Sequence, residues 1–174
     1  MALGGPQRIL SLVYGEELLS YDFGPSHVMN SARLKSFFTS LESSGLLSDN
    51  RILLIKPRRA TMEEIALYHD RKYIEFVKEM SEEGKGLLDH GDTPAFPGVF
   101  EAASLVVGST LEALEAVVRR DALYSMNPMG GLHHARRGKA AGFCVFNDIG
   151  VLIEKARREY GLRKILYVDL DAHH

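Results

Sequence analysis

The sequence predicts an α/β fold of three layers, in which a mainly parallel sheet is flanked by helices. Short apolar runs that suit strands alternate with longer segments of helical period, as expected for a layered α/β domain. The run at residues 164–168 (Lys-Ile-Leu-Tyr-Val) is apolar on both faces, which is typical of a central parallel strand covered from each side. No repeat, low-complexity tract or Pro-, Gly- or Ser-rich linker divides the 174 residues, so one domain is expected.

The first half of the chain contains two predicted strands and three predicted helices. Residues 8–14 form an apolar opening strand, and residues 29–41 carry apolar side chains at helical spacing before a Ser-Ser-Gly turn. A second short strand is expected at 51–55, where a proline follows. Thr61 to Leu67 opens with the Thr-x-x-Glu spacing of a capping box. Asp70 is expected to cap a further helix that runs through Met80.

The second half is predicted to alternate between helix and strand. A long helix is expected at 99–118, although Gly108 inside it weakens the helical pattern. A strand at 122–125 and a helix at 147–160 follow. The predicted central strand at 164–168 then ends the series, and polar residues begin only where it stops.

The composition is that of an ordinary globular domain, with 45% hydrophobic and 25% charged residues. A formal charge of -2 gives no electrostatic reason to expect nucleic acid or an anionic membrane as a partner. The lone Cys144 excludes an intrachain disulfide and suits a reducing compartment. Residues 1–6 lack the pattern of a secretory leader, and no apolar run approaches the ~18 residues of a membrane span. A cytoplasmic location is expected.

Polar groups suited to metal binding follow the predicted last strand. Asp169, Asp171 and His173 are spaced two residues apart, so in extended conformation they project to the same side. Ligands of open α/β sheets bind beyond the carboxyl ends of the strands, which is where this cluster lies. Carboxylate and imidazole are good zinc donors. The alternative is that these residues only cap a turn.

A second cluster is the adjacent pair His133 and His134, which follows two glycines. Glycine penalises regular structure, so the pair is expected in a loop rather than in a helix or strand core. Imidazole transfers protons near neutral pH, and two in sequence could act as base and electrostatic stabiliser. The alternative is an incidental surface pair.

Seven short segments along the chain form a set of motifs in a fixed order and spacing. They are residues 27–33, 69–77, 92–94, 130–135 (Gly-Gly-Leu-His-His-Ala), 142–144 (Gly-Phe-Cys), 147–149 (Asn-Asp-Ile) and 169–174 (Asp-Leu-Asp-Ala-His-His). Together they closely resemble the signature of the histone deacetylase superfamily, which includes acetoin-utilisation proteins and acetylpolyamine amidohydrolases. The resemblance implies an arginase/deacetylase-like fold and covers nearly the whole chain.

The resemblance also implies the roles of the polar residues. Asp171 and His173 would bind zinc, which polarises the amide carbonyl of the substrate. His134 would be the general base, and His133 the neighbouring imidazole, supported by Asp169. A monovalent cation, potassium, is implied near Asp169.

The implied substrate is an acetylated lysine or a small acetylated amine. Gly142 and Phe143 would line the channel for its chain, while Asp92 would hold its backbone at the rim. Cys144 is expected to be a small buried residue beside the channel rather than a nucleophile.

The resemblance is incomplete at the carboxyl end. Family members continue with a Gly-Asp-Gly segment, a second zinc-binding aspartate and an oxyanion-stabilising tyrosine, which have no counterpart in residues 1–174. The chain is therefore expected to be the N-terminal part of a deacetylase-like domain, weak or inactive alone. The edge of the predicted strand at 165–168 would favour an oligomer or a complementing chain. Two alternatives remain: a non-catalytic metal- or ligand-binding module, and an arginase-type hydrolase with two manganese ions.

Overall fold

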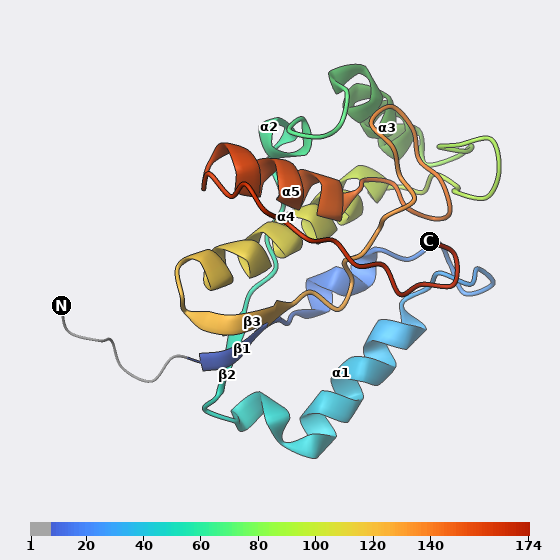
Figure 1. The fold of residues 1–174 in the computed structure, drawn as a ribbon. Helices are drawn as coiled ribbons and strands as arrows, with labels where there is room; N and C mark the ends of the chain where they lie inside the picture. Colours follow the sequence, from blue (N-terminus) through green and yellow to red (C-terminus); the bar gives the residue numbers. More distant parts are fainter. Residues whose placement is uncertain (1–7) are drawn as a thin grey trace.

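A parallel sheet of three strands lies at the centre of the molecule, in the order β2-β1-β3 (Figure 1). The computed structural model describes residues 8–174, so the sequence reading of residues 1–6 lies outside the described part. Leu10 in the middle strand is in register with Ile52 on one side and Tyr124 on the other. The strands are β1 (Arg8–Val13), β2 (Ile52–Ile55) and β3 (Ala122–Met126).

Helices lie on both faces of this sheet, with α4 and α5 on one face and α1 on the other (Figure 1). The predicted three-layer α/β fold with a parallel sheet is confirmed. The helices are α1 (Ala32–Ser44), α2 (Met62–Ile65), α3 (Arg71–Glu83), α4 (Val99–Val118) and α5 (Asp148–Arg158), with short 3-10 helices η1 (Glu16–Ser20) and η2 (Leu46–Ser48).

The long helix α4 forms the centre of the hydrophobic core. It contacts β1, β3, α3 and α5, and Val106, Val107 and Leu111 are inaccessible to solvent. A helix that is apolar nearly all round is stable only when it is buried on most sides. Its bounds agree with the predicted range 99–118.

Local signals explain where several other helices begin and end. Thr61 and Glu64 form the predicted capping box, in which each side chain accepts a hydrogen bond from the other residue's amide. Helix α1 starts later than predicted, at Ala32, and is closed after Ser44 by Gly45 in the left-handed conformation that favours glycine. Helix α2 is shorter than expected, because only one turn is helical after the cap.

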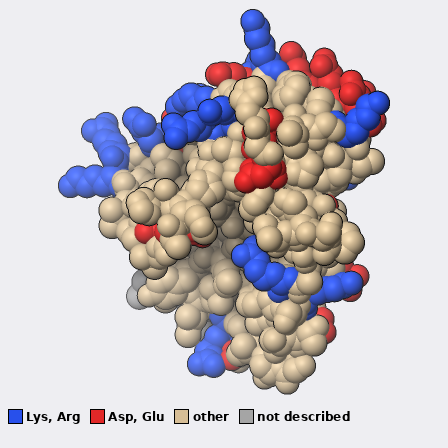
Figure 2. Space-filling view, turned by 90° about the vertical axis from the view of Figure 1, so that its right-hand side faces the viewer, with Lys and Arg blue, Asp and Glu red and all other residues tan. Residues whose placement is uncertain are grey.

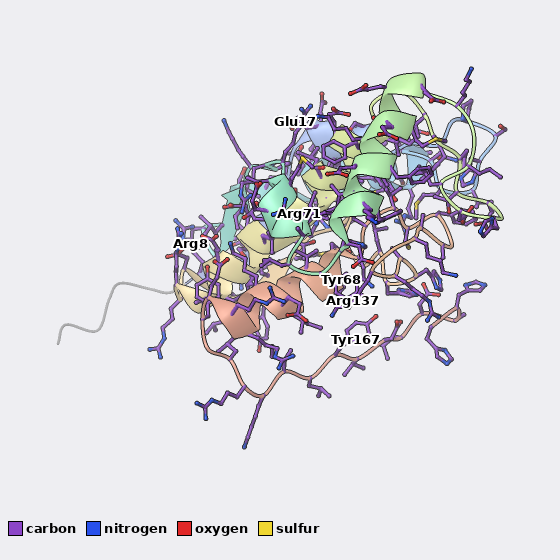
Figure 3. The ribbon with its side chains drawn as sticks, turned by 90° about the horizontal axis from the view of Figure 1, so that it is seen from above. Arg8, Glu17, Tyr68, Arg71, Arg137 and Tyr167 are labelled. Carbon is purple, nitrogen blue, oxygen red and sulfur yellow. The ribbon has the colours of Figure 1, made fainter. Side chains whose placement is uncertain are left out.

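The predicted central strand at residues 164–168 is not formed in this structure. The segment has no assigned secondary structure, and in the described residues its backbone makes no ladder with β3. Figure 3 shows the trace that carries Tyr167 running alongside α5. Leu166 is 87% exposed and Val168 62%. A central strand needs partners on both edges and cover on both faces, and the described part of the chain provides neither beyond β3.

Candidate active site

A cavity of about 500 Å³ brings together most of the residues that the sequence predicted as a site. It lies where the loops that follow β3 and α5 meet the start of α1 and the loop between α3 and α4. Seven of the eight predicted site residues line it. These are Asp92, His133, His134, Gly142, Phe143, Asp171 and His173.

The surface around these residues is hollowed. Figure 2 shows a recess near the middle of this face, bordered by acidic side chains on one side and a basic side chain on the other, while most lysine and arginine side chains lie around the periphery. One apolar and one cationic side chain, Met29 and Arg33, border the cavity from the α1 side. The arrangement gives the cavity a mixed wall of imidazole, carboxylate, aromatic and backbone groups.

The rings of the two histidines lie against each other on the loop after β3, with centroids 4.1 Å apart and planes tilted by 56°. The Nε2 of His133 lies 3.1 Å from the carbonyl oxygen of His173, and its Nδ1 lies 3.2 Å from that of Gly131. Partial burial, together with the neighbouring His133, lowers the pKa of His134 below its ordinary 6.5. His134 is therefore mainly neutral at pH 7 and able to accept a proton.

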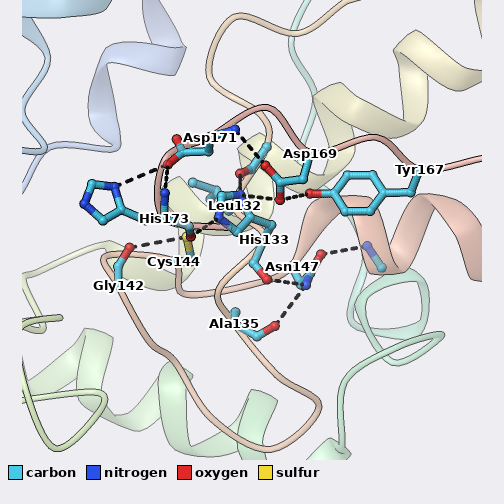
Figure 4. Close-up of polar contacts among 12 residues, drawn as sticks. Leu132, His133, Ala135, Gly142, Cys144, Asn147, Tyr167, Asp169, Asp171 and His173 are labelled. Atoms are coloured by element: carbon cyan, nitrogen blue, oxygen red, sulfur yellow. Dashed lines mark hydrogen bonds and ion pairs between the residues drawn. The ribbon is translucent and has the colours of Figure 1, made fainter.

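Asp169 does not line the cavity but lies behind His133. Its Oδ2 is 3.6 Å from Nδ1 of His133 and accepts a hydrogen bond from the hydroxyl of Tyr167 at 2.5 Å. Figure 4 shows Asp169 between the tyrosine and the imidazole. The Tyr167 hydroxyl lowers the pKa of Asp169, so the carboxylate is ionised and faces His133.

The turn at Gly142 and Phe143 is built from two residues with positive φ, 54° and 66°. A side chain at Gly142 would place its Cβ 2.7 Å from the ring of His134, so this position needs glycine. The Phe143 amide donates to the hydroxyl of Thr93 at 3.1 Å, and its carbonyl accepts from the hydroxyl of Tyr21 at 2.6 Å. These anchors hold the Phe143 ring at the cavity wall.

The rim beside this turn contains Asp92 and His27. The ring of His27 lies edge-on to that of Phe143, at 4.6 Å between centroids. Its Nε2 lies 3.4 Å from the backbone oxygen of Asp92. His27 is a rim residue that the sequence marked only as part of a matching segment.

Asp171 and His173 lie together on the cavity wall, with Asp171 Oδ1 3.3 Å from His173 Nδ1. The backbone amide of His173 donates to the same oxygen at 2.7 Å, and this bond lowers the pKa of Asp171. A carboxylate and an imidazole are a donor pair that fits zinc. Both side chains are more than half exposed, and residues 8–174 contain no group of three His, Cys, Asp or Glu arranged to hold a metal ion.

Three supporting residues were not singled out from the sequence. Tyr21 and Thr93 anchor Phe143, and buried His69 accepts a hydrogen bond from the amide of Asn147 at 2.8 Å. Each belongs to a segment at least 50 residues from its partner. Local pattern therefore contains no signal for them, apart from the positions of His69 and Thr93 in two of the matching segments.

Cys144 is buried next to the turn, as the sequence predicts. Burial raises the pKa of its thiol to about 11. The thiol is therefore protonated at neutral pH, which is unsuitable for a nucleophile.

Comparison with known proteins identifies the family. The model of the histone deacetylase domain matches residues 27–174, and the chain belongs to the histone deacetylase family. The chain is 40% identical to the acetoin utilization protein AcuC of Bacillus subtilis, covering 93% of this chain and 43% of that protein. It is 37% identical to histone deacetylase 8 of Xenopus tropicalis, covering 77% of this chain and 37% of that protein. The chain thus spans less than half the length of these relatives.

A solved structure agrees with the fold. The HDA15 HD domain superposes with a TM-score of 0.74 at 22% sequence identity, over 87% of this chain and 43% of that one. At this identity the likeness concerns the fold alone. Among the helices of residues 8–174, none combines the length and the apolar character needed to cross a membrane.

Proposed function

We propose that the chain is the N-terminal part of a zinc-dependent deacetylase that acts on acetylated lysine or small acetylated amines. The observation that carries the proposal is the single cavity that His134, Asp171, His173 and Phe143 line together. Membership of the histone deacetylase family supports the reaction class. The lone buried cysteine supports a cytoplasmic location.

The histidine pair is proposed to move the proton. His134, held neutral by partial burial, would be the general base. His133 would stabilise developing charge, since the ionised Asp169 lies 3.6 Å from its Nδ1. A base that is neutral at working pH is the requirement for this step.

Asp171 and His173 are proposed to hold zinc, with potassium near Asp169. Zinc would supply polarisation of the acyl carbonyl. The two residues already share a hydrogen-bonded turn on the cavity wall. A catalytic zinc takes three protein ligands, so this pair is one donor short.

The substrate would enter past the rim and along the turn at residues 142–143. The Phe143 ring and the backbone of Gly142 form an apolar side of the cavity, which suits an alkyl chain. Asp92 would accept hydrogen bonds from the substrate backbone at the rim. This arrangement favours a long acylated amine over a compact substrate.

A zinc titration with a fluorogenic acetyl-lysine substrate tests the proposal. We expect zinc-dependent release of the fluorophore with a chain extended to the length of the relatives. We expect weak or no release with residues 1–174 alone, because one metal donor and the oxyanion donor are missing. Failure of the extended chain to hydrolyse any acetylated amine, with zinc bound, would exclude the proposed reaction.

The division of roles makes a separate prediction. Asp171→Ala and His173→Ala should abolish stoichiometric zinc uptake by the extended chain, because each removes a donor. His134→Ala should keep zinc uptake and lose deacetylation by about 10²- to 10⁴-fold, the usual contribution of a general base. Calorimetric zinc titration and the fluorogenic assay measure the two effects. Equal loss of zinc in all three variants would contradict these roles.

A non-catalytic metal- or ligand-binding module is the second candidate. The exposure of Asp171 and His173 favours it, since both side chains are open to solvent and residues 8–174 place no third donor beside them. Binding of zinc by the extended chain without hydrolysis would support this function. Two manganese ions per chain would instead indicate the arginase type.

A further inference from the structure

We propose that Asp148 is a positioning residue for the histidine pair, acting through the backbone of the loop and not by contact with either ring. The inference rests on the proposed function of His133 and His134. Asp148 is the first residue of α5 and has no solvent exposure. Its carboxylate accepts hydrogen bonds from the amides of Leu132 at 2.7 Å and Gly131 at 3.1 Å.

A third donor holds the same carboxylate from α4. The hydroxyl of Thr110 donates to Asp148 Oδ2 at 2.6 Å and accepts from Nδ2 of Asn127 at 2.8 Å. The same Nδ2 also donates to the carbonyl of Val106 at 3.1 Å. The anchor is therefore the largely buried helix α4, which fixes the carboxylate relative to the core.

Every contact of the carboxylate is with a donor, so the ionised form satisfies both oxygens. Burial raises the pKa of Asp148, whereas the bonds from Thr110, Gly131 and Leu132 oppose that shift. The amino end of α5 adds a favourable dipole. If the amides of Gly131 and Leu132 moved away, the buried charge would lose hydrogen-bond partners, which is costly. The carboxylate therefore holds the backbone at these two amides in place.

Gly130 shows that the loop is shaped to meet this carboxylate. A Cβ at Gly130 would lie 2.8 Å from Asp148 Oδ2 and 2.9 Å from Thr110 Oγ1. A side chain at the first glycine of the Gly-Gly-Leu-His-His segment would therefore clash with the Asp148 carboxylate and the Thr110 hydroxyl.

Asn147 holds the other side of the pair. Its Nδ2 donates to the carbonyls of His133 at 3.1 Å and Ala135 at 2.9 Å, as Figure 4 shows. Its Oδ1 accepts from the Gly150 amide and caps α5. Asp148 therefore fixes the backbone before the histidines and Asn147 fixes it at and after them, so the start of one helix sets both rings over the cavity.

The test compares Asp148→Asn and Thr110→Val with Thr110→Ser, which keeps the hydroxyl, and with Asp49→Asn. Asp49 also accepts a backbone amide, that of Arg51 at 2.8 Å, but lies on an exposed turn before β2. Amide and imidazole NMR of the 174-residue chain gives a readout that needs no activity. The extended chain gives kcat and KM for an acetyl-lysine substrate.

We expect Asp148→Asn to speed hydrogen exchange at the Leu132 amide at least about tenfold, since a bond to a charged acceptor is lost. The resonances of both imidazoles should move, and kcat should fall about 10- to 100-fold with KM changed less than about threefold. Thr110→Val should give the same changes in weaker form, and it serves as the test if Asp148→Asn does not fold. Thr110→Ser and Asp49→Asn should leave the imidazoles unchanged.

Unchanged imidazole resonances and kcat in folded Asp148→Asn or Thr110→Val would overturn the inference. A loss of kcat/KM that comes from a higher KM with unchanged kcat would overturn it as well. If the resonances move as expected and no variant of the extended chain cleaves an acetylated amine, the proposed function fails while the positioning role stands.

Discussion

His69 is a buried imidazole whose two ring nitrogens both have partners. Its Nε2 accepts from the Asn147 amide at 2.8 Å, so Nδ1 carries the proton and donates to the carbonyl of Arg137 at 3.2 Å. Arg137 in turn lies over the ring of Tyr68, with its guanidinium carbon 4.7 Å from the ring centroid (Figure 3). Protonation of Nε2 would break the hydrogen bond from the Asn147 amide. The neutral form of His69 therefore helps to hold the backbone at the start of α5.

This environment makes folding sensitive to acid. Burial lowers the pKa of His69 from 6.5 to about 4, so between these values the unfolded chain binds a proton that the folded chain does not. Stability should be retained above pH 6.5 and fall as pH drops toward 4, by roughly 3 kcal/mol at ~1.4 kcal/mol per pKa unit. Urea unfolding at pH 7 and pH 5 measures the slope.

Two variants separate His69 from other titrating groups. His69→Gln should lose part of the difference between pH 7 and pH 5, because the group that titrates is gone. His90→Gln removes an exposed imidazole and should keep the difference. Identical pH slopes in all three proteins would contradict this assignment.

At the scale of single residues, the sequence predicted the side chains that line the cavity but not the residues that hold them in place. His133, His134, Asp171 and His173 were predicted from residue type, spacing and glycine flanks, and they line one cavity. Tyr21, Thr93 and the buried partners of Asp148 were not predicted, because their hydrogen bonds join segments distant in sequence. Such contacts depend on tertiary packing, which local patterns do not specify.

Among the elements, α4 shows how a local penalty is overridden by packing. Gly108 weakens the helical pattern, yet the helix continues through it. The backbone of residues 58–60 crosses there: a Cβ at Gly108 would lie 2.2 Å from the carbonyl oxygen of Arg58 and 2.5 Å from the amide nitrogen of Ala60. The Ala60 amide donates to Ser104 on the same helix at 2.8 Å. Glycine lets the two backbones meet.

Gly108→Ala should therefore destabilise the protein despite the better helix propensity of alanine. Overpacking costs up to roughly 3 kcal/mol and propensity returns ~1 kcal/mol, so we expect a net loss of about 2 kcal/mol. Thermal or urea unfolding measures it. Gly91→Ala is the control, since no atom lies within 4 Å of its added Cβ. A stabilised Gly108→Ala variant would show that the crossing backbone yields.

The elements also show where pattern reading fails. The bounds of α4 and the positions of β1, β2 and β3 follow from apolar period and length. The run at 164–168 has the same apolar character as a buried strand but remains exposed. An apolar pattern indicates that a segment is suited to burial between two layers. Whether the segment is buried depends on the elements that pack beside it.

At the scale of the whole molecule, a group of apolar side chains among residues 8–174 is exposed to solvent. They belong to β3 and to the segment after α5, and their exposed fractions range from 52% to 92%. Exposed apolar surface of this kind favours association. The residues are Leu123, Tyr124, Leu166, Val168 and Leu170.

We therefore predict concentration-dependent self-association of the 174-residue chain. Tyr124→Glu and Leu166→Glu should shift it toward monomer while changing the free energy of unfolding by less than about 0.5 kcal/mol, as for most surface substitutions. Light scattering after size exclusion measures the mass. Val28→Glu, which replaces a side chain 81% exposed elsewhere, should leave association unchanged. A monodisperse monomer at all concentrations would contradict the prediction.

The way in which Phe143 is anchored has a consequence for substrate preference. Thr93 and Tyr21 grip only its main chain, so the form of the turn does not rely on which side chain stands there. Since the residue has φ 66°, β-branched replacements are disfavoured, whereas leucine or asparagine would be accommodated. A single substitution at residue 143 should therefore widen or narrow the entrance of the cavity without changing the backbone turn around it.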